Sequence, residues 1–82
     1  MPLSEGHKAV LKMSDGYRNL YQLVHRDGWV IARRSLSFGG GDLKVTLERD
    51  GEERIVVVRG PGSSVVQMLI TNREPFPNPD EL

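Results

Sequence analysis

Residues 14–28 have the sequence SDGYRNLYQLVHRDG, and the fold of the chain depends on whether they form a helix or a strand. At helical spacing, one face of the segment would carry four aromatic or apolar side chains: Tyr17, Leu20, Tyr21 and Val24. Ser14 could cap the start of this helix and Gly28 could end it. However, the helix would contain Gly16 in its first turn, and the segment is rich in the aromatic and β-branched residues that favour strands. We therefore favour a strand here and keep the helix as the alternative.

Asp-Gly pairs at both ends of this segment and further along the chain predict tight turns. They lie at residues 15–16, 27–28 and 50–51. Asp tolerates left-handed backbone conformations and Gly adopts them at no steric cost, so both residues favour turns. We expect the first two pairs to connect three strands, which are formed by residues 7–13, 17–26 and 29–34.

The clearest pair of strands lies within residues 43–59, LKVTLERDGEERIVVVR. Apolar and polar residues alternate over residues 43–49, so this strand is predicted to have one buried face. Residues 54–59 are apolar on both faces, which is typical of a central strand that is covered on each side. We expect the two segments to form an antiparallel hairpin.

The register of this hairpin depends on the length of its loop. A three-residue loop at residues 50–52 places Glu48 opposite Arg54, whereas a two-residue loop places Glu48 opposite Glu53. Opposite charges at such positions contribute about 0.2–1 kcal/mol, and like charges are destabilising. We therefore predict the three-residue loop.

The last part of the chain predicts one more strand and a tail. Residues 60–63, GPGS, have the composition of a tight turn, and residues 65–71 have the apolar content of a largely buried strand. Prolines at every second position over residues 75–79 remove backbone donors and end any sheet. We expect a single globular β domain over residues 1–71, followed by a proline-rich, partly ordered tail over residues 72–82.

These segments together predict an all-β fold, a small antiparallel barrel or curled sheet of five to six strands. The alternative is an α+β fold in which one helix, near residues 15–26, packs on a four- or five-stranded sheet. The predicted core consists of Leu11, Leu20, Trp29, Ile31, Leu43, Val45, Leu47, Ile55, Val57, Val66, Met68 and Ile70.

Length and composition narrow the class of protein. The chain has 82 residues, enough for one domain, and it contains no cysteine, which excludes a disulfide scaffold and thiolate chemistry. Eleven basic residues balance 11 acidic ones, which argues against a bulk polyanion binder or a polybasic membrane anchor. The sequence has no long apolar run and no leader-like pattern, so we expect a cytoplasmic protein that does not contact a membrane.

The charges are distributed unevenly along the chain. Residues 1–34 contain six basic and three acidic residues, whereas residues 35–82 contain five basic and eight acidic ones. Because complementary charges can meet within the domain or between chains, we predict a non-catalytic interaction module that binds another protein or itself. The alternative is a small barrel that binds single-stranded nucleic acid through basic groups interleaved with aromatic rings. The candidate binding residues are Arg18, Arg26, Arg33, Arg34, Tyr17 and Trp29.

No motif in the sequence predicts catalysis. The two histidines, His7 and His25, do not have the spacing of a recognised metal motif. Ser63 and Ser64 lie beside glycines but lack the Gly-x-Ser-x-Gly pattern of a nucleophile elbow. Residues 39–41 are glycines without the Lys-Ser/Thr pair of a phosphate-binding loop, and they are predicted to form a flexible loop between strands. We expect no enzymatic activity, no bound metal and no cofactor.

Overall fold

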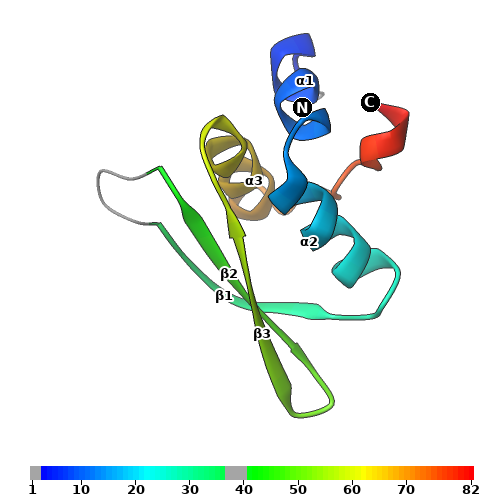
Figure 1. The fold of residues 1–82 in the computed structure, drawn as a ribbon, viewed down its shortest axis with the longest axis vertical. Helices are drawn as coiled ribbons and strands as arrows, with labels where there is room; N and C mark the ends of the chain where they lie inside the picture. Colours follow the sequence, from blue (N-terminus) through cyan, green and yellow to red (C-terminus); the bar gives the residue numbers. More distant parts are fainter. Residues whose placement is uncertain (1–2, 37–40) are drawn as a thin grey trace.

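The computed structural model describes residues 3–36 and 41–82, and these residues form an α+β fold with a three-stranded antiparallel sheet (Figure 1). In chain order, the elements are α1 (Glu5–Lys12), α2 (Asp15–His25), β1 (Val30–Leu36), β2 (Leu43–Arg49), β3 (Glu52–Val58), α3 (Pro61–Thr71) and the short 3-10 helix η1 (Pro79–Glu81). The all-β prediction of five to six strands is therefore wrong, because the sheet is open and three α-helices accompany it. Phe38 and most of the predicted glycine loop lie outside the described residues.

The helix α2 occupies the segment for which we favoured a strand. Its N-terminus is capped by Ser14, whose hydroxyl accepts a hydrogen bond of 3.1 Å from the Tyr17 amide. Tyr17, Leu20 and Leu23 are buried on one face, so the helical spacing of the apolar residues matches the core. The alternative prediction, an α+β fold with a helix near residues 15–26, is correct about this helix. Its four- or five-stranded sheet is wrong, because the sheet has three strands. Capping and a continuous apolar stripe outweigh the β propensity of single residues.

The helix α1 replaces the predicted strand at residues 7–13. Ser4 caps it by accepting a hydrogen bond of 3.1 Å from the His7 amide. Strand alternation would place Leu11 and Met13 on one face, but Leu11 is fully buried whereas Met13, which ends the helix, is 86% exposed. Alternation over a short segment is therefore a weak guide, because a helix with few apolar residues can produce the same pattern.

The helix α3 replaces both the predicted turn at residues 60–63 and the predicted strand at residues 65–71. Gly60 has φ = 65° and precedes the helix, and Pro61 is the first helical residue. Proline is favoured at this position because the first helical amides have no partner within the helix. Val65, Val66 and Leu69 are buried against the rest of the molecule. Burial of this face on neighbouring elements stabilises a helix that is rich in β-branched residues.

The β2–β3 hairpin has the two-residue loop that we rejected. Asp50 (φ = 51°) and Gly51 (φ = 83°) both have positive φ, as a type I′ turn requires, and Glu48 consequently pairs with Glu53. The twist of a type I′ turn matches that of the strands, and this preference outweighs side-chain pairs worth about 0.2–1 kcal/mol each. The Glu48–Glu53 repulsion is offset by Arg33 of β1, whose guanidinium lies 3.1 Å from the Glu53 carboxylate.

The three helices lie on one side of the sheet (Figure 1), where α2 and α3 pack on the strands and α1 packs on α3. The core lies between these elements. On the covered face, the strands contribute five buried residues: Leu43, Val45, Leu47, Val56 and Val58. The register inverts the prediction for β3, because Val56 and Val58 are buried whereas Ile55 is 62% exposed and Val57 is half-buried. Of the other predicted core residues, those confirmed as buried are Leu11, Leu20, Trp29, Leu43, Val45, Leu47 and Val66, and those partly buried against the core are Ile31, Met68 and Ile70.

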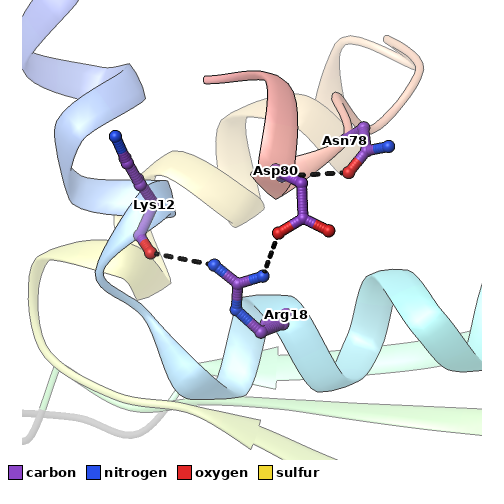
Figure 2. A network of polar contacts seen from close by, with 4 residues as sticks. All are labelled: Lys12, Arg18, Asn78 and Asp80. Carbon is purple, nitrogen blue, oxygen red and sulfur yellow. Dashed lines mark hydrogen bonds and ion pairs between the residues drawn. The ribbon is translucent and has the colours of Figure 1, made fainter.

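The proline-rich segment packs against α2. Phe76 meets Tyr17 edge-to-face at 5.8 Å between ring centroids, and the Tyr17 hydroxyl donates a hydrogen bond to the Pro77 carbonyl. Figure 2 shows Arg18 reaching from α2 to Asp80, at 2.6 Å, and to the Lys12 carbonyl. These contacts attach the last residues of the chain to α2, and Arg18 also joins α2 to the end of α1.

Candidate interaction surface

The six candidate binding residues do not form one surface. Arg18 lies on α2 and pairs with Asp80, whereas Arg26 follows the end of α2. Arg33 and Arg34 are neighbours in β1, but their side chains point to opposite faces of the sheet. Arg34 is on the helix-covered side and donates a hydrogen bond of 3.3 Å to the Thr71 hydroxyl at the end of α3.

The two aromatic candidates are part of the core. Tyr17 is fully buried, and Trp29 is 6% exposed. The guanidinium of Arg49 lies over the Trp29 ring, at 4.8 Å from its centroid, and donates a hydrogen bond of 2.8 Å to the Asp27 carbonyl. Neither ring therefore presents a free face on which a nucleic-acid base could stack.

The side of the sheet opposite the helices has a distinct composition, and we call it the open face. The strand register assigns nine residues to it in three rows across β1, β2 and β3: Val30, Glu48 and Glu53, then Arg33, Thr46 and Ile55, then Ser35, Lys44 and Val57. A β-bulge between Ile31 and Arg33 brings both Val30 and Arg33 to this face, although strict alternation would separate them. No α-helix within residues 3–36 and 41–82 covers the open face (Figure 1).

The open face exposes large apolar side chains among balanced charges. Val30, at the end of the face on β1, is 65% exposed, and Ile55, in the middle row on β3, is 62% exposed. Thr46, in the centre, is only 9% exposed because its neighbours surround it. Arg33 reaches across β2 to Glu53, so two basic and two acidic residues share the face. Six of the nine residues are polar, as on an ordinary solvated sheet face, so the exposed Val30 and Ile55 are what sets this face apart.

A hollow of about 670 Å³ adjoins the open face at the C-terminal end of β3. Val57 belongs to both, and Val10, Met13 and Pro61 extend the apolar lining across the ends of α1 and α3. Arg59 and other polar groups complete the lining. The apolar surface thus continues from Ile55 through Val57 toward the helices.

The apolar residues on both faces of β3 are visible in the sequence and indicate the open face, although from the sequence alone we attribute them to a central strand. The apolar residues on both faces of residues 54–59 predicted a central strand, but β3 is an edge strand in the order β1-β2-β3. Its second apolar face, formed by Ile55 and Val57, is therefore the one that the helices of the described residues leave uncovered. An edge strand that is apolar on both faces indicates a surface that is available for contact.

The described residues offer little for metal binding or proton transfer. They contain no group of three or more His, Cys, Asp or Glu residues arranged to hold a metal ion. His7 and His25 lie on different helices, α1 and α2. Burial, together with the neighbouring Tyr21, raises the pKa of Tyr17 far above its ordinary value, and its hydroxyl is engaged by the Pro77 carbonyl. None of the helices in residues 3–36 and 41–82 has the length and apolar character needed to cross a membrane.

Comparison of the chain with protein families, curated proteins and solved structures finds no match. Its function is therefore inferred from its own surface.

Proposed function

We propose that this protein is a small, non-catalytic interaction module that binds another protein chain through the open face of its sheet. The observation that carries the proposal is the contrast between the two faces. The strands bury five apolar residues under the helices, yet Val30 and Ile55 remain 65% and 62% exposed on the other side.

Exposed apolar residues on a sheet face are a source of binding free energy. Full burial of a Val or Ile side chain contributes about 1.5–3 kcal/mol relative to an exposed one. The surrounding charges, Arg33, Lys44, Glu48 and Glu53, would orient a partner more than they would increase its affinity. This combination of apolar anchors and mixed charges is typical of a protein-binding surface.

The alternative prediction, binding of single-stranded nucleic acid, has less support. The predicted stacking residues Tyr17 and Trp29 lie in the core, and the acidic partners of Arg18 and Arg33 reduce the charge available to phosphates. It remains a prediction, which oligonucleotide binding at two salt concentrations would test.

The proposal can be tested by placing a photoreactive amino acid at position 55 of the full chain. The matched control carries the same group at position 22, because Gln22 is exposed on α2 on the covered side of the sheet. Both proteins are irradiated, alone and in extract of the cells that contain the natural protein. We expect a covalent adduct at position 55 whose yield exceeds that at position 22, because the open face is the one that meets a partner.

Competition shows whether such an adduct is specific. If the adduct contains a different protein, excess unlabelled wild-type protein should reduce it, whereas excess Ile55→Asp protein should not. If it contains a second copy of the chain, added wild-type protein should itself be captured, whereas Ile55→Asp protein should not. The mass of the adduct distinguishes a second copy of the chain from a different protein. Equal or negligible yields at positions 55 and 22 would contradict the proposal.

A further inference from the structure

We infer that the partner of the open face is a second copy of this chain, docked face to face about a two-fold axis that runs perpendicular to the strands. This inference rests on the proposed function and adds to it the identity and the orientation of the partner. The open face is suited to self-association because its charges are arranged with opposite signs on the two sides of its centre.

The central strand carries this arrangement. On the open face of β2, Glu48, Thr46 and Lys44 follow one another at every second position. Thr46 lies in the middle row, so an acidic group and a basic group are placed symmetrically on its two sides.

Two symmetric arrangements stack the open face of one copy on that of the other with β2 over β2. The positions of the charges distinguish the favourable arrangement from the unfavourable one. A two-fold axis parallel to the strands places Glu48 over Glu48 and Lys44 over Lys44, which brings like charges together. An axis perpendicular to the strands reverses the order of the rows. Each Glu48 then lies over Lys44 of the other copy, and the symmetry forms this contact twice.

The same axis also places Ile55 and the centre of the face over their own copies, while Val30 lies over Ser35 and Val57 lies over Glu53. It places the two β3 strands over one another, so Ile55 of one copy meets Ile55 of the other in the middle row. Thr46 meets Thr46, and hydroxyl groups can hydrogen-bond to each other. Arg33 also meets its counterpart, but each Arg33 lies 3.1 Å from its own Glu53, so the facing groups are neutral ion pairs.

The size of the face predicts the strength of the dimer. Three strands of seven residues span a face of about 23 Å by about 14 Å, at the usual rise and strand spacing. This is smaller than the roughly 800 Å² per partner of a standard interface. We therefore expect a reversible dimer that dissociates on dilution, with the two sheets crossing at about 30° as in other face-to-face packings.

Sedimentation velocity of the full chain over a wide concentration range tests the inference. We expect a concentration-dependent dimer for the wild type. Lys44→Glu places a carboxylate over Glu48 of the other copy at both symmetric contacts, and Glu48→Lys does the equivalent with ammonium groups. Each single substitution should weaken the dimer at least tenfold, and the double substitution should restore it to within a few fold of the wild type.

Mixing the two single variants provides the sharpest readout. Neither variant should dimerise alone, but an equimolar mixture should form a heterodimer, because both of its contacts then join opposite charges. Arg26→Glu and Glu81→Lys make the same charge changes on exposed residues outside the open face, so they should leave the dimer unchanged. Circular dichroism verifies that each variant is folded. If Lys44→Glu or Glu48→Lys does not fold, the neutral substitutions Lys44→Gln and Glu48→Gln are used in its place.

A wild-type chain that stays monomeric at every concentration would overturn the inference. If Lys44→Glu and Glu48→Lys dimerise as well as the control variants, or if their mixture does not associate, the proposed orientation of the two copies is overturned. If the purified chain is monomeric but position 55 cross-links to a different protein, this inference fails while the proposed function stands. If position 55 forms no specific adduct and the chain is monomeric, both fail.

Discussion

At the scale of single residues, Gly16 controls how closely α2 approaches the sheet. A Cβ atom at this position would lie 2.6 Å from the Val57 carbonyl oxygen and 3.0 Å from the Val58 Cα, and both of these are backbone atoms. Backbone cannot move aside as a flexible side chain can, so the absence of a side chain allows the contact. The glycine that argued against a helix in the sequence is therefore explained by tertiary packing.

We expect Gly16→Ala to lower the free energy of unfolding by about 1–3 kcal/mol, the usual cost of forcing an extra group into a packed contact. Chemical denaturation of the full chain measures this value. Gly6→Ala is the matched control, because a Cβ there would be in ordinary contact with the Ser4 hydroxyl, at 3.8 Å. In α1 this change should be neutral or stabilising by up to about 1 kcal/mol, owing to the higher helix propensity of alanine. Equal effects at the two positions would contradict the close approach at Gly16.

At the scale of elements, the Asp50–Gly51 turn sets the face to which every residue of β3 points. A two-residue loop puts Val56 and Val58 under the helices and Ile55 and Val57 on the open face. A loop one residue longer would exchange the two pairs, because side chains alternate along a strand. The turn thus determines which apolar residues are available for binding.

We expect Gly51→Ala to lower the free energy of unfolding by about 1–2 kcal/mol, because φ at this position is 83° and a Cβ makes that region unfavourable. Thermal or chemical unfolding measures the loss. Asp50→Asn is the control, since Asn is well suited to the first position of a type I′ turn and should have little effect. Backbone nuclear Overhauser contacts between Glu48 and Glu53 should be present in the wild type. Contacts between Glu48 and Arg54 instead would show that the longer loop forms.

At the scale of the whole molecule, ion pairs join the basic first part of the chain to the acidic remainder. Arg18 contacts Asp80 at 2.6 Å, and Arg33 contacts Glu53 at 3.1 Å. Both pairs are largely solvated, so each contributes about 0–1 kcal/mol to stability. Arg18 links the tail to α2, and Arg33 links β1 to β3 across β2.

The burial of Tyr17 should make the stability of the whole molecule sensitive to alkaline pH. The pKa of Tyr17 is raised in the folded protein, first by burial and then by Tyr21, whereas in the unfolded chain it returns to about 10. Above that pH the unfolded state loses a proton that the folded state retains, so the free energy of unfolding falls as the pH rises. Below pH of about 10 this group should cause no change.

Denaturant unfolding of the wild type and of Tyr17→Phe at several pH values measures this effect. Near neutral pH, Tyr17→Phe should cost about 1 kcal/mol, because it removes the hydrogen bond to the Pro77 carbonyl. At alkaline pH the difference between the two proteins should shrink. Tyr21→Phe retains the Tyr17 hydroxyl and should still show the decline. A pH dependence that is the same in Tyr17→Phe as in the wild type would contradict the assignment to Tyr17.

The sequence contains enough local information to define β2, the Asp50–Gly51 turn and much of the core. The turn predicted at residues 15–16 is wrong, because Asp15 and Gly16 are the first two residues of α2. Leu43, Val45 and Leu47 alternate over the length of one strand, and all three are buried as predicted. Asp-Gly pairs are local signals, because the backbone preferences of these two residues do not depend on the rest of the chain. The strand at residues 43–49 is confirmed with its predicted bounds.

The tertiary structure decided the features on which the candidate surface depends. Residues 5–12 and 61–71 contain short apolar patterns that suit a strand as well as a helix. Packing of α1 against α3, and of α3 against the sheet, selected the helix. Which face of β3 is buried depended on one residue in a turn, and which face of the sheet is open depended on where all three helices lie. Alternation along a strand shows only that two faces differ, and the elements that pack on one of them determine which face is left to bind a partner.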